Sequence, residues 1–164
     1  MNQLLTESKN KIENMIYEVR GKQVMLASDV AKLYNSEVNR INEVVKRNSN
    51  RFPEEFCFQL SSEEYKKIKD EISLRSQNAT LENVTTGKGK YPKYLPYVFT
   101  EHGIMMLSGL LKSDIAARVN IQIINAFVEM RKYIANNNYD KRLSNIEIKL
   151  IEHDNSFKEL FDKF

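Results

Sequence analysis

The sequence predicts an α+β fold: small β-hairpins packed with a helical core that contains a helix-turn-helix, followed by a C-terminal coiled-coil helix. Three observations predict it: apolar strand patterns around a glycine at residues 16–26, two short amphipathic patterns at residues 28–48, and a heptad repeat from residue 139. A chain of 164 residues, of which 41% are hydrophobic, fits one ordinary domain plus an appendage. We therefore expect a domain over residues 1–136 and an oligomerisation helix over residues 137–164.

The first elements are a hairpin and a pair of helices. Ile16–Val19 and Gln23–Leu26 flank a turn that contains Gly21, which is typical of a β-hairpin. Ser28 is a natural N-cap for the helix that follows, and Asp29 complements the positive end of its dipole. Asn35 tolerates the left-handed conformation that the next turn needs, and Ser36 is expected to cap the second helix.

The second helix combines an apolar stripe with a polar, basic face. Val38, Ile41, Val44 and Val45 recur at helical spacing and predict the buried side. The opposite face carries Asn39, Arg40, Glu43, Lys46 and Arg47. Such a face suits the recognition helix of a helix-turn-helix, because amide and guanidinium groups read base edges and basic side chains bind phosphates. A plain helical hairpin is the alternative.

The middle of the chain mixes strand and helix signals. Pro53 ends a helical pattern, and residues 56–60 suit a short strand. Ser61 followed by Glu64 forms a capping box for a helix expected to end at about residue 71.

A polar stretch over residues 72–90 predicts a mobile loop, and residues 91–99 an extended segment. Together these suggest a hairpin whose tip presents Lys88 and Lys90 to phosphate. A solvated loop is the alternative.

Two further helices should complete the domain. Thr100 caps the first of them, and Ser113 with Asp114 opens the second. The second is apolar around much of its circumference from Ala116 to Met130, which predicts a central, buried helix ending at about Ala135.

The tail follows a heptad repeat. Apolar residues at alternating spacings of four and three begin at Tyr139 and end at Phe164. Between them lie the residues we expect to mediate oligomerisation: Leu143, Ile146, Leu150, His153, Phe157 and Leu160. His153 departs from the apolar pattern. It either fixes the register in which the helices pair or weakens their pairing. The stripe predicts self-association, and the alternative is a helix folded back on the domain.

Several classes of protein are excluded by what the sequence lacks. Cys57 is the one cysteine and stands in an apolar run, so we expect a buried thiol and no internal disulfide. Neither a signal peptide nor an apolar run of membrane-spanning length occurs, which favours the cytoplasm and argues against a membrane role. No pattern of a metal site, a nucleotide loop or a catalytic nucleophile is present, so we expect no enzyme activity, no metal and no cofactor.

Several blocks together resemble a known family. They are residues 16–26, residues 28–34, Val45–Asn48 with Arg51–Leu60, and Tyr94–Gly103 followed by Met106-Leu107. In this order they resemble the ORF6N domain, a relative of the KilA-N domain, over about residues 10–130. The resemblance implies a DNA-binding module of phages and bacterial mobile elements, found in regulatory and antirepressor-like proteins of a bacterial or phage-infected cell.

The resemblance also guides the choice of site residues. It places DNA contacts in the region 28–48 and makes Arg51 either a phosphate ligand or the ion-pair partner of Glu54 or Glu55. His102 stands where the family often has Gln, which argues against an essential role. Core positions are expected at Phe52, Pro53, Phe56, Tyr97 and Phe99.

The resulting DNA-contact set is Asn39, Arg40, Glu43, Lys46, Arg47, Arg51, Lys88 and Lys90. The function expected is that of a transcriptional regulator that binds double-stranded DNA and self-associates through its tail. The alternative is an antirepressor that sequesters a repressor protein and binds little DNA of its own.

Overall fold

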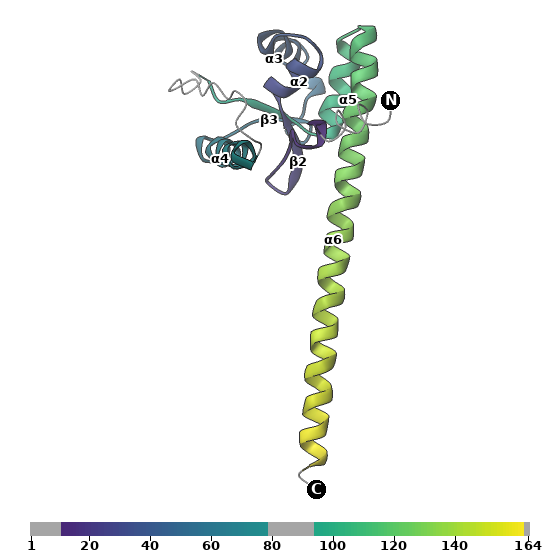
Figure 1. The fold of residues 1–164 in the computed structure, drawn as a ribbon. Coiled ribbons are helices and arrows are strands. Elements are labelled where there is room, and N and C mark those ends of the chain that lie inside the picture. Colours follow the sequence, from purple (N-terminus) through teal and green to yellow (C-terminus); the bar gives the residue numbers. More distant parts are fainter. Residues whose placement is uncertain (1–10, 79–93, 163–164) are drawn as a thin grey trace. The chain divides into compact units, whose positions relative to one another are not determined.

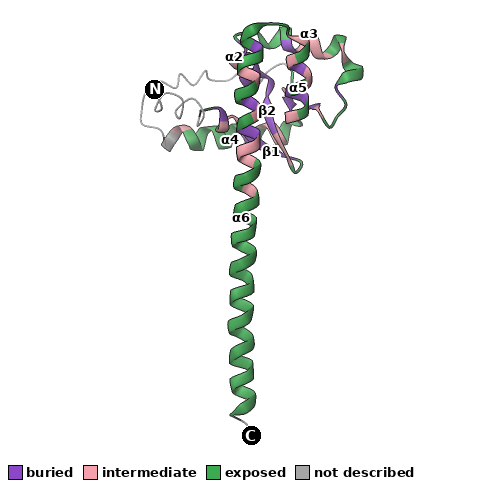
Figure 2. Ribbon diagram, turned by 90° about the vertical axis from the view of Figure 1, so that its right-hand side faces the viewer, coloured by how far each residue is buried: buried purple, intermediate pink, exposed green. Residues whose placement is uncertain are grey.

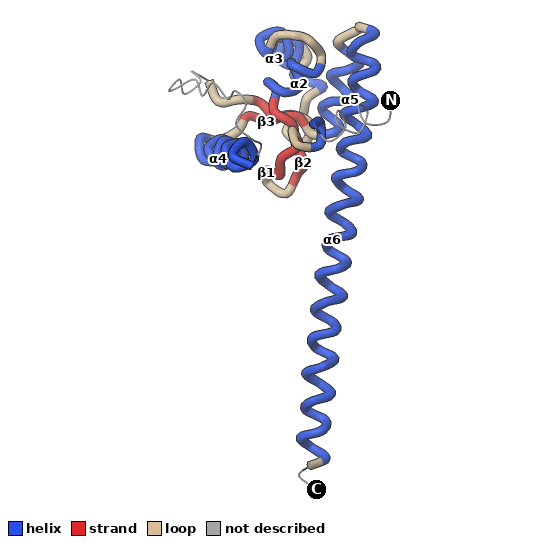
Figure 3. The backbone as a smooth tube through the Cα atoms, in the orientation of Figure 1, coloured by secondary structure: helices blue, strands red, loops and turns tan. Residues whose placement is uncertain are grey.

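The computed structural model describes residues 11–78 and 94–162 and confirms the α+β class (Figures 1 and 3). The elements are, in order, β1 (Ile16–Val19), β2 (Lys22–Leu26), α2 (Ala27–Leu33), α3 (Val38–Arg47), the 3-10 turn η1 (Ser49–Arg51), β3 (Cys57–Gln59), α4 (Ser62–Asn78), β4 (Tyr97–Phe99), α5 (Glu101–Leu110) and α6 (Asp114–Phe161). The chain divides into two compact units, Met1–Phe127 and Val128–Phe164. None of the helices in the described ranges is both long enough and apolar enough to cross a membrane.

The strands form one antiparallel sheet in the order β1-β2-β4-β3. The predicted hairpin is confirmed: Val19 pairs with Lys22, so that Arg20 and Gly21 form the loop. Their φ angles of 54° and 72° are the left-handed values of a type I′ turn, which glycine adopts at low cost. β4 lies between β2 and β3, so the sheet is larger than separate hairpins would make it.

The two faces of the sheet pack against different helices, as the strand period of two requires. One face packs on α4, which lies on the opposite side of the sheet from α2 and α3 (Figure 1). The hydrophobic cluster between this face and α4 contains Tyr17, Val19, Val24, Leu26, Phe58, Leu60, Ile68 and Val98. Met25 of β2 and Phe99 of β4 are paired across the two strands and are fully buried. They alternate along their strands with residues of this cluster. They therefore belong to the other face, where α2 and α5 contact the sheet.

Helix α4 begins as predicted and ends later than predicted. The capping box is confirmed, because the Ser61 backbone N–H donates to Glu64 Oε2 at 2.8 Å and the Glu64 N–H donates to Ser61 Oγ at 3.2 Å. The predicted end at about residue 71 is wrong, since residues 72–78 continue the helix. Arg75 explains the difference: it donates to the Asn14 carbonyl, and its guanidinium lies 5.2 Å from the centre of the Tyr17 ring.

The predicted caps of α5 and α6 are confirmed. Thr100 Oγ1 accepts from the Gly103 N–H at 3.4 Å, and Ser113 Oγ accepts from the Ala116 N–H at 3.1 Å. Thr100 also donates its hydroxyl to the Glu55 carbonyl at 2.9 Å, which ties α5 to the turn before β3.

The prediction of a central α6 is wrong in two respects. Only one face is buried, at Ala116, Ile123, Ala126 and Phe127, whereas Ile115 and Ile121 are more than half exposed. The helix also continues past Ala135 and through residues 136–138 to Phe161. Asparagine lowers helix propensity only mildly, so three exposed asparagines do not end a helix of this length.

The aromatic core was predicted in part. Phe52 and Phe99 are buried and meet edge to face, with ring centroids 6.2 Å apart, and Phe56 and Tyr97 are half-buried. Pro53 is exposed, contrary to the prediction, because it sits in a surface turn where its carbonyl accepts the N–H groups of Phe56 and Cys57. Cys57 is buried as expected, and burial raises the pKa of its thiol to about 12.

Candidate nucleic-acid interface

The connection between α2 and α3 is a tight turn built on a left-handed residue. Asn35 has φ of 50°, as its side chain predicted. The Ser36 N–H donates to the Ala31 carbonyl at 2.8 Å, and the Asn35 N–H donates to the Lys32 carbonyl at 3.1 Å. This pair of bonds is a Schellman motif with asparagine in the position that glycine usually takes. It closes α2 and sets the direction in which the chain enters α3.

The caps predicted for these two helices are wrong. Ser28 lies inside α2, which starts at Ala27 directly after β2 and has Leu26 at its N-cap position without a side-chain bond. The N-cap of α3 is Glu37, again without a side-chain bond. Ser36 is engaged in the Schellman motif instead, and its hydroxyl is buried without a hydrogen-bond partner among the described residues.

Helix α3 separates its two faces as the spacing predicts (Figure 2). Ile41 is fully buried, and Val44 and Val45 are half-buried, while α3 packs against α2 and α5. The stripe is incomplete at Val38, which is exposed. The five candidate contact residues of this helix are all exposed: Asn39, Arg40, Glu43, Lys46 and Arg47. Within the described ranges none of them forms a side-chain hydrogen bond or an ion pair, so the face is free to meet a ligand.

The segment after α3 holds Arg51 at the surface. The Asn48 side chain donates to the Val44 carbonyl at 2.9 Å and so closes the end of α3. Arg51 is exposed, and no described carboxylate pairs with it. The ion pair with Glu54 or Glu55 is therefore not formed, and Glu54 pairs with Arg20 at 3.2 Å instead. The lysines predicted at a hairpin tip, Lys88 and Lys90, lie outside the described residues.

An open apolar groove of about 360 Å³ lies beside Arg51. It is lined by Arg51, Phe56, His102, Met105, Met106, Gly109 and Leu110. The His102 ring stacks on Phe56 with centroids 5.5 Å apart, and Met105 is half exposed. The groove was not predicted from the sequence, because its walls come from segments about 50 residues apart. Met105 stands in the apolar run from Ile104 to Leu107, so no local signal set it apart.

Comparison with protein-family models matches residues 14–110 to the ORF6N domain. The chain belongs to the ORF6N domain family. This membership points to a phage-type regulatory or antirepressor-like protein. No curated protein and no solved structure matches the chain. The matched range covers β1 through the last residue of α5, so the α2–α3 pair and the groove both lie within the ORF6N domain.

A second charged cluster of the ORF6N domain escaped sequence reasoning. The Arg20 guanidinium donates to both Glu64 oxygens, at 2.7 and 3.1 Å, and lies 4.4 Å from the Phe58 ring centre. Hydrogen bonds from Arg20 and from the Ser61 backbone lower the pKa of Glu64 to about 2. Arg20 stands in the hairpin loop, so this cluster fixes the hairpin to the start of α4. We regard it as structural, because its charges satisfy one another.

The domain also contains a buried acid, Asp29, in α2. Asp29 lies in the first turn of α2, and desolvation raises the pKa of its carboxyl against the opposing effect of Lys32, 3.5 Å away. In the described part of the chain, no group of three or more His, Cys, Asp or Glu side chains is arranged to hold a metal ion. Asp29 stands in the first turn of α2, where a carboxylate interacts favourably with the positive end of the helix dipole.

Proposed function

We propose that this protein is a DNA-binding regulator in which α2 and α3 act as a helix-turn-helix and α3 enters the major groove. The observation that carries the proposal is the outer face of α3, where exposed basic and amide side chains stand free of intramolecular partners. The residues from Ser36 to Arg51 include four basic and two acidic side chains, so the face is locally positive. The family assignment supports the same conclusion.

The residue types suggest distinct tasks on DNA. Lys46 and Arg47, in the last turn of α3, are suited to the phosphate backbone, and Arg40 to phosphate or guanine. Asn39 can read adenine, and Glu43 can accept from the cytosine amino group. Arg51 follows α3 closely and suits a phosphate contact at the edge of the same surface. This function requires access to DNA, which places it in the cytoplasm of a bacterial or phage-infected cell, and it needs no catalysis, cofactor or metal.

Fluorescence anisotropy with duplex DNA, titrated with salt, tests the proposal. We expect wild-type affinity to fall steeply with salt, because bound phosphates release counterions. The variant Arg40→Ala/Lys46→Ala/Arg47→Ala should bind more weakly and with a shallower slope, which decreases by about 0.9 for each phosphate that the variant no longer neutralises. Failure of the wild type to bind at low salt, or wild-type binding by the triple variant, would refute the proposal.

A matched control removes the same charge elsewhere. Lys66, Lys67 and Lys69 lie on α4, on the other side of the sheet from α3 (Figure 1). Their triple alanine variant lowers the net charge equally, so it should keep most of the affinity and the slope if α3 binds the DNA. An equal weakening in both variants would show that net charge alone drives binding.

The apolar groove favours a second candidate function, the capture of a repressor protein. Solvent-facing apolar side chains beside an arginine are typical of protein-binding surfaces. In this case Met105→Glu should abolish binding to a purified candidate repressor, and the α3 triple variant should retain it. The reverse result would assign the activity to α3.

A further inference from the structure

In the second unit, α6 continues from Val128 to Phe161, and the apolar heptad stripe of this segment faces solvent. Tyr139, Leu143, Ile146, Leu150, Phe157 and Leu160 are between 53% and 63% exposed. Leu143, Leu150 and Phe157 occupy position a of the heptad, and the d positions hold Tyr139, Ile146, His153 and Leu160. A stripe with this length and period is typical of a helix that takes part in a coiled coil. The charges that flank the stripe indicate which chain can cover it.

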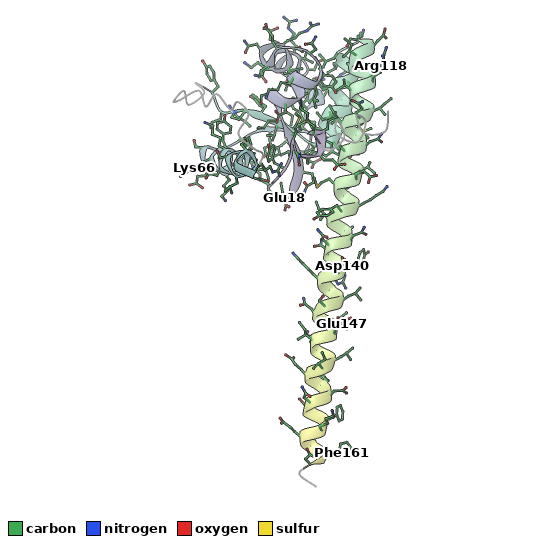
Figure 4. All side chains as sticks on the ribbon, in the orientation of Figure 1. Glu18, Lys66, Arg118, Asp140, Glu147 and Phe161 are labelled. Atoms are coloured by element: carbon green, nitrogen blue, oxygen red, sulfur yellow. The ribbon has the colours of Figure 1, made fainter. Side chains whose placement is uncertain are left out.

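The flanking positions segregate charge by sign. Position e is acidic, at Asp140, Glu147 and Asp154, and position g is basic, at Arg142 and Lys149. Figure 4 labels Asp140 and Glu147, which lie seven residues apart and share a heptad position. In the described part of the chain, Arg142, Glu147, Lys149 and Asp154 form no ion pair with one another or with other residues. Their charges are available to a partner.

Parallel pairing with a second copy satisfies these charges. In a parallel coiled coil, a g residue faces the e residue that lies five positions later on the neighbouring strand. Arg142 then meets the partner's Glu147, and Lys149 meets the partner's Asp154. Both contacts occur twice by symmetry, and all of them join opposite charges.

Antiparallel pairing opposes like charges. In that orientation e faces e and g faces g in every heptad register. Aligning Ile146 with the partner's Phe157 places Glu147 beside the partner's Asp154. Since every e position from 140 to 154 is acidic, a shift by a heptad does not remove the repulsion.

We infer that the tail associates with a second copy of this chain in parallel, in-register orientation, directed by the g-to-e′ pairs of Arg142 with Glu147 and of Lys149 with Asp154. This inference rests on the self-association expected for the proposed function and adds its orientation. Parallel strands bring the N-terminal ends of the two tails together, so two ORF6N domains precede the pair at the same end. Two copies of one DNA-reading surface at one end suit a two-fold symmetric target.

A double-mutant cycle measured by analytical ultracentrifugation of the full chain tests the orientation. Arg142→Glu and Glu147→Arg each turn two attractive contacts into repulsive ones, so we expect each to raise the dissociation constant by about tenfold. The double variant Arg142→Glu/Glu147→Arg restores opposite charges and should return to within about threefold of the wild type. In 1 M NaCl the differences should shrink, because salt screens exposed charges.

Three results would overturn the inference. Tighter association of Glu147→Arg would indicate the antiparallel helix, where the new arginine meets Asp154. Wild-type affinity in both single variants, or a wild type that stays monomeric at about 100 μM, would do the same. Since the assay contains no DNA and the variants leave α3 intact, its failure is distinct from failure of the proposed function. The Arg40/Lys46/Arg47 alanine variant should associate like the wild type.

Discussion

Replacing Gly103 by alanine should destabilise the ORF6N domain, although alanine is the better helix former. Gly103 lies in the first turn of α5. A Cβ atom there would stand 2.0 Å from the Phe56 carbonyl oxygen, 2.9 Å from its carbon and 3.3 Å from Phe99 Cδ1. The nearest atom belongs to the backbone, so the Phe56 carbonyl must move away.

The cost follows from what that carbonyl holds. It accepts the Thr100 N–H at 3.0 Å and shares the Thr100 hydroxyl proton, at 3.3 Å, with the Glu55 carbonyl. Overpacking a filled site costs about 1–3 kcal/mol, and each weakened hydrogen bond about 1 kcal/mol. Alanine regains about 1 kcal/mol of helix propensity. We expect Gly103→Ala to lower the free energy of unfolding by about 2–4 kcal/mol.

Gly109 in the same helix supplies the control. Among the described residues, nothing beyond the chain neighbours and the local backbone of α5 lies within 4 Å of a Cβ built there, so Gly109→Ala should raise the free energy of unfolding by about 0.5–1 kcal/mol. Urea unfolding followed by tyrosine fluorescence measures both variants, because Tyr17 and Tyr34 are buried and the chain has no tryptophan. A Gly103→Ala protein as stable as the wild type would refute the close approach of α5 to Phe56.

Three further predictions concern single side chains. Ser36→Ala should leave the urea midpoint unchanged or raise it, because the hydroxyl is buried without a partner; a loss of about 1 kcal/mol would instead restore its role as an N-cap. Glu64→Gln should be less stable than the wild type at pH 7, and the difference in melting temperature should close as pH falls from about 4.5 toward 2, since the native pKa of this carboxyl is lowered and protonation then removes its charge. A difference that persists at pH 2 would contradict this. The Cys57 thiol should resist aromatic disulfide reagents at pH 8 in the folded protein and react fully in urea, and rapid reaction of the folded chain would show that the thiol is accessible.

Features with signals confined to a few neighbouring residues could be predicted from the sequence. The hairpin depends on the Gly21 turn, the start of α4 on the Ser61–Glu64 box, and the start of α5 on Thr100. The outer face of α3 was predictable for the same reason, because helical periodicity alone separates Ile41 from Arg40.

Features that depend on distant partners could not be predicted. The last turns of α4 rest on Arg75 and its contact with the Asn14 carbonyl, 61 residues earlier. The Arg20–Glu64 pair joins residues 44 positions apart, and nothing near Arg20 indicates its partner. Ser36 was compatible with two local roles, the end of α2 and the N-cap of α3. In the structure its N–H closes the Schellman motif of α2, and Glu37 occupies the N-cap position of α3.

The position of β4 inside the sheet sets a condition on the order in which a newly synthesised chain can fold. The β1–β2 hairpin joins residues 16–26 and can form early, since its contacts are local. β3 has β4 as its neighbour in the described sheet, so it stays without a paired strand until Tyr97–Phe99 has left the ribosome. Until then β2 also lacks its β4 neighbour, and the apolar residues of the hairpin stay exposed to solvent. Nascent chains released before residue 97 should therefore aggregate, whereas chains that extend through α5 should fold.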